Sequence, residues 1–350
     1  MHQEFTTFEE IVTQTEAWSE AIAVVEDKAD ELAHLDLDRY QQVLFTGCGS
    51  TYYLSLAGSS LLQAMTGAIS KALPSSESLL HPESAFCKGR NLLIAVSRSG
   101  LTTETLQNVK RFKDRGLGEV VTITNYGDSP LALLGDINIV IGAGREKSVA
   151  QTRSFASMLV AITALSYSLG PGDSFAQYEN DLVDAGTRLI TDYQEYARVT
   201  GIDHEVDQIF YLGSGPLYGL ASEGSLKMKE MSQTVTEPFH SFEFRHGPIS
   251  MVDGNTLVVG LMSQGGFYHE QSVLEDARSF GAKTMTVGEE NTDVEFASGL
   301  PEQARGVLYL PVLQLLAYFR AVSSGKNPDD PQNITSVVEL DLNISAPQER

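Results

Sequence analysis

VLFTGCGSTYYLSLAGSSLLQAM (43–65) returns 166 residues later in the chain as IFYLGSGPLYGLASEGSLKMKEM (209–231). Each copy has an apolar stretch, a Gly-x-Gly turn and a helix-like segment, which predicts a strand followed by a helix. A second pair of segments, NLLIAVSRSG (91–100) and NTLVVGLMSQGG (255–266), follows the two copies in the same order. This period exceeds the roughly 20–50 residues of solenoid repeats. The chain therefore predicts two copies of one α/β domain.

Short apolar runs alternate with helical segments along both copies. Runs without internal polar alternation are typical of strands buried on both faces, so we expect each copy to be a parallel, doubly wound sheet flanked by helices. The expected strands are 43–47, 91–97, 120–125, 137–142, 209–213, 256–263 and 282–288. The expected helices of the first copy are 51–65, 102–115 and 148–168.

These elements divide the chain into four parts. An N-terminal helical segment (1–35) precedes a first α/β domain (36–170) and a second one (171–340), and a polar tail (341–350) ends the chain. LGPGDSF, at 169–175, is the best candidate for the linker between the domains, because Gly and Pro cluster there.

Composition excludes several classes of partner. The net charge of −22 repels nucleic acid and anionic membrane, so we expect neither as a partner. Cys48 and Cys87, the two cysteines, form neither a disulfide framework nor a metal cluster, and we expect no metal and no cofactor. The N-terminus lacks the features of a signal peptide, and no uninterrupted apolar run approaches the length of a membrane span. We expect a soluble, cytoplasmic protein.

Hydroxyl side chains gather at two turns of the first copy. Ser97, Ser99 and Thr102 follow one strand and open a helix, with Arg98 among them. A Gly-bearing turn at a helix start presents N–H groups to an anion, and Ser50-Thr51 at the earlier turn would lie beside it, so a phosphate monoester is one candidate ligand. The alternative is simple helix capping by Ser and Thr, and the sequence leaves both open. A dinucleotide site is disfavoured, since Tyr52 replaces the third glycine of the usual motif.

The second copy carries ionisable side chains where the first is apolar. Glu223, Lys227 and Glu230 replace the residues Ala57, Leu61 and Ala64 of the first copy. Their spacing places all three on one helix face, and His246 lies sixteen residues beyond Glu230. A carboxylate, an amine and an imidazole can together open a sugar ring and move a proton between adjacent carbons. Spacing alone favours the alternative, in which the glutamates and the lysine form a surface ion pair and His246 has a structural role.

Four motifs closely resemble those of the sugar isomerase (SIS) family: SRSGLTTET, EKSVAQTRSF, EGSLKMKE and FEFRHGP. They follow the order found in the isomerase half of glutamine–fructose-6-phosphate aminotransferase and in stand-alone glucosamine-6-phosphate deaminases and fructosamine-6-phosphate deglycases. The resemblance covers residues 40–339. It implies two tandem SIS domains, of which the first holds phosphate and the second supplies the catalytic helix and the histidine loop.

The resemblance also assigns roles to residues of this chain. It implies that Glu230 is the general base for proton transfer between C1 and C2, that Lys227 lies beside the sugar hydroxyls, and that His246 opens the ring. In the aminotransferase this histidine comes from the neighbouring subunit, which implies a homodimer here. The implied phosphate ligands are Ser50, Thr51, Ser97, Arg98, Ser99 and Thr102, and the implied sugar contacts are Val149, Ala150, Gln151 and Glu223.

Three positions depart from the family pattern. Arg98 stands where the family usually has Gln, which would add a charge-assisted bond to phosphate. Gln151 stands where the aminotransferase has Ser. Ser336 occupies the position of a lysine tied to imine and ring-opening chemistry, which disfavours a Schiff-base route, and Lys326 lies ten residues upstream, too far to substitute. The chain also has no room for a glutaminase domain before Tyr40, so a full aminotransferase is not expected.

The expected substrate is a hexose 6-phosphate or amino-sugar 6-phosphate. The favoured reaction is deamination and isomerisation of glucosamine 6-phosphate to fructose 6-phosphate. The alternatives are a fructosamine-6-phosphate deglycase, a plain aldose–ketose isomerase, and a phosphosugar sensor that binds without catalysis.

Overall fold

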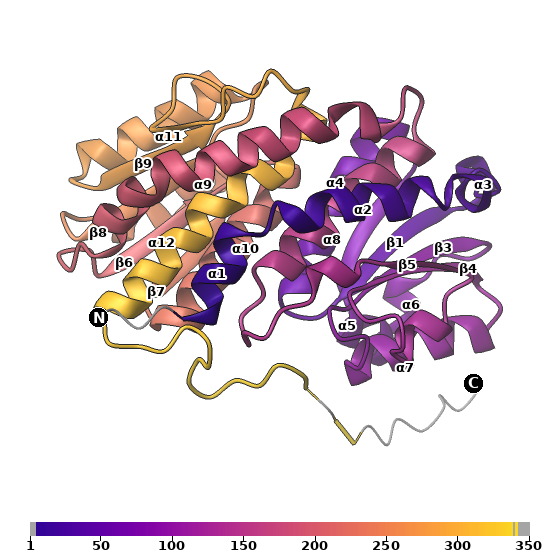
Figure 1. Ribbon diagram of the computed structural model, residues 1–350. Coiled ribbons are helices and arrows are strands. Elements are labelled where there is room, and N and C mark those ends of the chain that lie inside the picture. Colours follow the sequence, from indigo (N-terminus) through magenta and orange to yellow (C-terminus); the bar gives the residue numbers. More distant parts are fainter. Residues whose placement is uncertain (1–4, 339, 342–350) are drawn as a thin grey trace.

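The computed structural model describes residues 5–338, 340 and 341 and contains two parallel five-stranded sheets (Figure 1). The first sheet has the order β2-β1-β3-β4-β5 and the second the order β10-β9-β8-β6-β7. When the strands of each copy are numbered 1 to 5 along the chain, both sheets have the order 2-1-3-4-5 of doubly wound folds. The predicted pair of parallel α/β domains is confirmed.

The first sheet comprises β1 (Gln42–Gly47), β2 (Ser70–Pro74), β3 (Asn91–Val96), β4 (Gly118–Thr124) and β5 (Ile137–Val140). The second comprises β6 (Gln208–Leu212), β7 (Val235–Phe239), β8 (Thr256–Leu261), β9 (Lys283–Gly288) and β10 (Val294–Glu295). The helices are α1 (Thr6–Val12), α2 (Glu16–Glu26), α3 (Ala29–Leu32), α4 (Ser50–Thr66), α5 (Ser75–Leu80), α6 (Pro82–Ala85), α7 (Thr103–Asp114), α8 (Arg153–Leu169), α9 (Glu179–Gly201), α10 (Pro216–Ser232), α11 (Phe267–Ser279) and α12 (Leu310–Ser323).

Strands β2 and β7 were not predicted from the sequence. Each is the outer neighbour of the first strand of its copy, β1 or β6. Their sequences, SKALP and VTEPF, are only partly buried and each contains a proline. Proline is confined to edge strands because it cannot donate to the sheet ladder. The apolar pattern that marks central strands is therefore absent from both.

Helices α4 and α10, the repeated segments, pack against each other at the junction of the two halves (Figure 1). A Cβ atom on Gly219 would lie 2.5 Å from the Tyr53 carbonyl oxygen and 2.6 Å from the Ala57 nitrogen. Only glycine fits at this crossing, so Gly219 lets the two backbones approach closely. The start of each helix lies beside the later part of the other: Ser50 is bonded to Glu223 and Lys227, whereas a Cβ on Gly215 would lie 3.9 Å from Ser60 Oγ.

The N-terminal helices do not stand apart from the two sheets. Helix α2 packs on α8, whereas α1 crosses to the second half and packs on α12. The backbone N–H groups of Thr6 and Thr7 donate to the Asp329 carboxylate, at 3.0 and 2.7 Å. The start of α1 is thus fastened to the segment that follows α12. Of the predicted polar tail, only Asp341 lies within the described residues.

One described segment, Gly306–Ser323, is long and apolar enough to cross a membrane. In the fold, 78% of this segment is buried inside the protein, and its helix α12 packs on α9 and α10. Its apolar character is explained by its place in the core.

Candidate active site

Glu223, Lys227 and Glu230 form one contiguous cluster on α10. The Lys227 ammonium lies 3.3 Å from Glu223 Oε1 and is also hydrogen-bonded to Glu230. The Glu223 and Lys227 side chains are 1% exposed, whereas that of Glu230 is 20% exposed. The predicted common face exists, but it is buried at the junction rather than on the surface. Glu230 is the member of the cluster that solvent or a ligand can reach.

Ser50, the first residue of α4, joins this cluster from the other half of the chain. Its hydroxyl donates to Glu223 Oε1 at 3.0 Å and accepts from Lys227 Nζ at 3.2 Å. Tyr53, one turn along α4, lies beside the same carboxylates: burial raises the pKa of its phenol and the Glu223 charge raises it further. The sequence did not identify Tyr53, because nothing in its spacing relates it to α10.

The surroundings of the cluster favour the protonated form of Glu223. Burial raises the pKa of Glu223 from 4.5 to about 8, against the lowering effect of Lys227. Burial disfavours the Lys227 ammonium, but the Glu223 and Glu230 carboxylates outweigh it, so its pKa is raised and the side chain stays charged. Glu223 Oε2 has no hydrogen-bond partner among the described residues. A proton on this oxygen is consistent with both observations.

The Gly-x-Gly turn that starts α4 has a steric purpose. A Cβ on Gly47 would lie 2.6 Å from the Thr51 carbonyl group, and Gly49 has a φ of 56°. Its counterparts behave alike: a Cβ on Gly213 would lie 2.4 Å from the Leu217 oxygen, and Gly215 has a φ of 57°. The two glycines therefore fold the strand end tightly onto the helix in both copies.

Thr51 uses its hydroxyl inside this turn. Thr51 Oγ1 donates to the Cys48 carbonyl and accepts from the Cys48 N–H, both at 2.9 Å. Thr51 is thus bonded within its own turn, and no side chain caps the start of α4, whereas Ser50 beside it is directed to the Glu223–Lys227 pair.

The loop between β3 and α7 carries the remaining predicted phosphate ligands. The Ser97 hydroxyl accepts from the Gly100 N–H and contacts Thr102 Oγ1, each at 3.2 Å, and the Ser99 hydroxyl accepts from the Leu101 N–H at 3.1 Å. These bonds shape a compact turn at the N-terminus of the twelve-residue helix α7. The three hydroxyls lie together at the positive end of that helix, where an anion is stabilised.

Arg98, which was expected to bind phosphate, is hydrogen-bonded to other parts of the protein. Its guanidinium donates to Glu146 Oε1 at 3.2 Å and to the backbone oxygens of Ser148, Val149 and Ser336, at 3.1, 3.0 and 3.0 Å. The side chain is thus engaged with protein acceptors. It fastens the loop before α8 and the C-terminal segment to the β3–α7 loop.

Glu146 is a buried residue of this region that sequence reasoning missed. Its carboxylate accepts from the backbone N–H groups of Thr152 and Ser154, at 3.0 and 3.2 Å, and so caps the start of α8. Its charge also contributes to the raised pKa of Lys227, which places it near the cluster. The motif EKSVAQTRSF begins with Glu146, so the sequence contained this residue in a recognised motif but gave it no role.

The predicted sugar contacts Val149, Ala150 and Gln151 lie on the loop that Arg98 and Glu146 hold. Ala150 is buried, and the Val149 N–H donates to the Asp329 carbonyl at 3.0 Å. Gln151 Oε1 is buried without a hydrogen-bond partner among the described residues. Its amide is an unsatisfied group next to the start of α8.

His246 is not brought to the cluster within the described chain. It follows β7 in a loop of the second half, and its side chain is exposed. Phe242 and Met251 of the same loop region are 50% and 58% exposed. The loop therefore presents a histidine between two exposed apolar side chains.

Comparison with known proteins gives one family. The family model described as the SIS domain matches residues 37–167 and 204–294. Glutamine–fructose-6-phosphate aminotransferase (isomerizing) of Pyrococcus horikoshii is 30% identical over 347 residues, which cover 95% of this chain and 57% of that protein. That of Sulfolobus acidocaldarius is 31% identical over 86% of this chain and 50% of its own length. The chain thus spans about half the length of the curated relatives it matches.

Solved structures share the fold over nearly the whole chain. A glucosamine-6-phosphate deaminase from Thermotoga maritima superposes with a TM-score of 0.81 and 27% identity, over 96% of this chain and 100% of that one. Tagatose-6-phosphate ketose/aldose isomerase from Escherichia coli has a TM-score of 0.83 at 23% identity, over 94% and 96%. The second likeness is one of fold alone.

Proposed function

This chain belongs to the SIS domain family, and we propose that it is a phosphosugar isomerase that converts glucosamine 6-phosphate and water to fructose 6-phosphate and ammonia. The observation that carries the proposal is the Glu223–Lys227–Glu230 cluster, completed by Ser50 from the other half. The 27% identical deaminase of Thermotoga maritima supports the choice of an amino sugar as substrate.

The cluster has the groups that this isomerisation needs. In the open-chain sugar, Glu230 removes the proton from C2 and returns it to C1, while O1 gains a proton and the C2 amine loses one, so that the C1 aldehyde becomes a hydroxymethyl group and C2 becomes an imine. Water then adds to the imine carbon and ammonia leaves, which gives the C2 ketone. No cofactor or oxidant enters this balance.

The other members of the cluster act on the sugar oxygens. The O1 oxygen gains negative charge while C2 loses its proton. Lys227, held as an ammonium and paired with Glu223, would stabilise that charge from its buried position. Ser50 orients both side chains through its two hydrogen bonds.

The phosphate is assigned to the β3–α7 loop. Ser97, Ser99 and Thr102 offer hydroxyls at the N-terminus of α7, where the helix dipole favours an anion. Because the protein has a net charge of −22, such local donors are needed to hold a dianion.

We further propose that the active unit is a homodimer in which His246 enters the partner's site. The exposed His246 loop and its flanking Phe242 and Met251 support this arrangement. Exposed apolar side chains around a reactive group are typical of an interface.

The test is a substrate panel with ammonia and fructose 6-phosphate both measured. We expect glucosamine 6-phosphate to release one ammonia for each fructose 6-phosphate formed. Glu230→Gln should lower kcat by about 10²-fold or more, while Glu237→Gln, the same change at an exposed strand residue, should not.

Other results would reassign the reaction. Turnover of fructoselysine 6-phosphate alone would indicate a deglycase, and interconversion of sugars without nitrogen would indicate a plain isomerase. Tight phosphosugar binding that is unaffected by Glu230→Gln, without any turnover, would indicate a sensor. Each of these outcomes contradicts the proposed deamination.

A further inference from the structure

The loop 146–152, which leads into α8, contains no helix or strand of its own. It lies between two parts of the candidate site. Arg98 of the β3–α7 loop donates to two of its carbonyl groups, and the charge of its Glu146 acts on Lys227. The expected sugar contacts, 149–151, belong to this loop. Whatever fixes the position of its backbone therefore bears on how a sugar is held.

Glu10, on the N-terminal helix α1, binds two backbone N–H groups of this loop. Its Oε1 accepts from the Lys147 N–H at 2.5 Å and its Oε2 from the Ser148 N–H at 3.3 Å. The residue is 4% exposed. A carboxylate removed from water in this way is costly unless donors replace the water, and here the loop supplies them. Glu10 and the loop are therefore bonded to each other inside the protein.

Thr7, one turn earlier on α1, provides a second attachment. Its hydroxyl lies 2.9 Å from Ser148 Oγ and donates to Asp329 Oδ1 at 2.7 Å. The carbonyl oxygen of Asp329 in turn accepts from the Val149 N–H at 3.0 Å. The three successive N–H groups of 147–149 are thus bonded to α1 or to the segment that α1 holds.

A second carboxylate acts at the far end of the loop. Glu146 accepts from the N–H groups of Thr152 and Ser154, beyond the expected sugar contacts. Glu10 holds the N–H groups before those contacts. Residues 149–151 therefore lie between two buried carboxylates, one from the loop itself and one from α1.

Helix α1 reaches this loop from the other half of the molecule. It packs on α12, in the second half, whereas the loop belongs to the first half (Figure 1). A loop without helix or strand bonds needs partners for its backbone polar groups from elsewhere in the protein. The N-terminal helix supplies them across the junction, a role that its sequence did not suggest.

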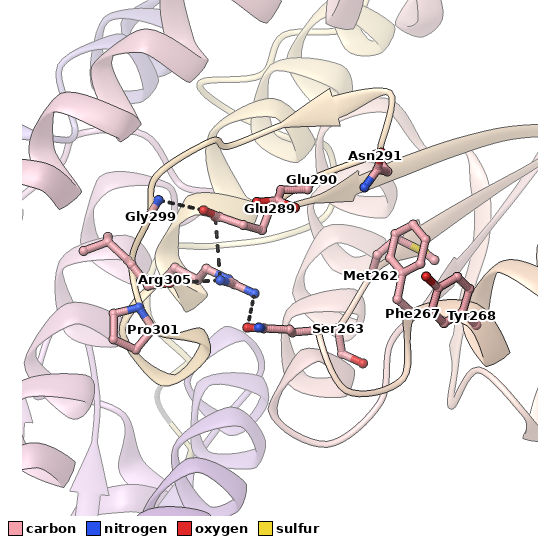
Figure 2. Close-up of a pocket in the computed structure, with 12 residues that line it drawn as sticks. Met262, Ser263, Phe267, Tyr268, Glu289, Glu290, Asn291, Gly299, Pro301 and Arg305 are labelled. Atoms are coloured by element: carbon pink, nitrogen blue, oxygen red, sulfur yellow. Dashed lines mark hydrogen bonds and ion pairs between the residues drawn. The ribbon is translucent and has the colours of Figure 1, made fainter.

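The second copy holds the corresponding loop with residues of its own half (Figure 2). The segment before α12 follows the edge strand β10, as the loop before α8 follows the edge strand β5. Glu289, after β9, accepts from the Gly299 N–H at 2.7 Å, and Arg305 donates to the Leu300 carbonyl at 2.9 Å. A carboxylate on loop N–H groups and a guanidinium on loop carbonyl groups thus recur in both copies.

The held segment of the second copy also lines a cavity of about 520 Å³ (Figure 2). Gly299, Leu300 and Arg305 are part of that lining, together with residues that follow β8 and β9. Ligands bind in such sheets outside the carboxyl ends of the strands. The recurring pair of charged groups therefore shapes a loop at the position where a ligand is expected. In the first copy, the carboxylate of the pair comes from α1.

We propose that α1 is part of the substrate site and that Glu10 is a positioning residue, which holds the sugar-contact loop 149–151 through the backbone of Lys147 and Ser148. Glu10 acts through the loop and does not touch the substrate. This inference rests on the proposed function, because it requires the sugar of a phosphosugar to lie against the loop.

Glu10→Gln is the test, because the amide keeps the size of the side chain but replaces one acceptor oxygen by an NH₂ group. We expect the amides of Lys147 and Ser148 to exchange hydrogen faster by about tenfold or more. A loop that contacts the sugar equally in the ground and transition states contributes uniform binding. The KM for glucosamine 6-phosphate should therefore rise about tenfold, while kcat stays within about twofold.

Inorganic phosphate, used as a competitive inhibitor, separates the sugar loop from the phosphate position. Phosphate is assigned to the hydroxyls of the β3–α7 loop, which Glu10 does not contact. Its inhibition constant in Glu10→Gln should stay within about twofold of the wild-type value, because uniform binding is lost only where the loop touches the ligand. A merely structural defect would not weaken sugar binding selectively.

Two further variants complete the test. Glu9→Gln makes the same change at the exposed neighbour on α1 and should leave exchange and kinetics unaltered. Thr7→Val removes the buried hydroxyl but keeps the shape of the side chain. It should raise KM in the same direction by about threefold, and it decides the matter if Glu10→Gln does not fold.

Three results would overturn the proposal: equal exchange at 147–148 in Glu10→Gln and Glu9→Gln, an unchanged KM, or a parallel rise in KM and in the inhibition constant of phosphate. A wild-type chain that turns over no hexose 6-phosphate would instead contradict the proposed function. The exchange measurement needs no substrate, so it still decides whether α1 holds the loop.

Discussion

The Ser50 hydroxyl of the first half donates to the Glu223 carboxylate of the second half at 3.0 Å, across 173 residues of chain. The same hydroxyl accepts from Lys227 at 3.2 Å. The duplicated segments therefore build one site together, in which the turn of one copy orients the ionisable helix of the other.

Removal of this hydroxyl tests how far it orients the cluster. Ser50→Ala leaves two buried ionisable side chains with one hydrogen-bond partner fewer, so we expect the protein to lose about 1–3 kcal/mol of stability and kcat to fall about tenfold. Ser60→Ala on the same helix, whose hydroxyl makes no described bond, is the matched control. Denaturant unfolding and steady-state kinetics measure the two effects, and equal behaviour of the two variants would contradict the assignment.

The raised pKa of Glu223 predicts a pH dependence of stability. Its pKa is about 8 in the folded chain and near 4.5 in the unfolded one, so the folded state binds the extra proton between these values. Stability should therefore fall as pH rises from about 5 through 8. Glu223→Gln, which keeps an oxygen for Ser50, should flatten this slope. Unfolding at a series of pH values measures it, and an unchanged slope in the variant would refute the prediction.

Arg98 is expected to act on the substrate through the loops that it holds. Arg98→Ala leaves the buried Glu146 without its cation, and we expect a loss of about 3–5 kcal/mol. Faster hydrogen exchange at 146–149 and around Ser336 should accompany it. Arg145→Ala, an exposed neighbour, is the control. A large rise in KM with unchanged stability would instead show that Arg98 binds the phosphate itself.

Gly219 should tolerate no side chain. Gly219→Ala places a Cβ 2.5 Å from the Tyr53 carbonyl oxygen, so α4 and α10 must separate. We expect a loss of about 1–3 kcal/mol and lower kcat, because Ser50 then moves away from the cluster. Gly254→Ala, where nothing lies within 4 Å of the new atom, is the matched control. Unfolding and kinetic measurements that fail to separate the two variants would contradict this account of the helix crossing.

The proposed homodimer predicts complementation between inactive variants. Glu230→Gln and His246→Ala should each be inactive alone. If each site combines residues of two subunits, mixed dimers regain one intact site in two, and co-expression should restore about a quarter of the wild-type activity. Absence of any recovery, in a preparation shown to contain mixed dimers, would mean that His246 serves its own subunit.

The sequence identified the central strands and the edge strand β5, and it missed the edge strands β2, β7 and β10. β1, β3, β6 and β8 each contain a run of at least three consecutive buried apolar residues, because strands buried on both faces need no polar alternation. β2 and β7 have half-buried residues and a proline, so no apolar signal marks them.

For the site, spacing along one helix was sufficient to join Glu223, Lys227 and Glu230. Spacing was not sufficient to predict that the Ser50 hydroxyl bonds to that cluster. Nor did it predict that Arg98 bonds to Glu146 instead of lying at the expected phosphate position. Those contacts join elements far apart in the sequence, and local periodicity carries no information about them.

By itself, the sequence determined the duplicated parallel α/β architecture, the common face of the ionisable helix and the hydroxyl loop of the first copy. These follow from periodicity and turn chemistry, which act over a few residues. The tertiary structure alone decided that this face is buried against α4 and that Ser50 completes it. The physical reason is the α4–α10 crossing at Gly219: its geometry depends on the close approach of two backbones, and no local pattern encodes that approach.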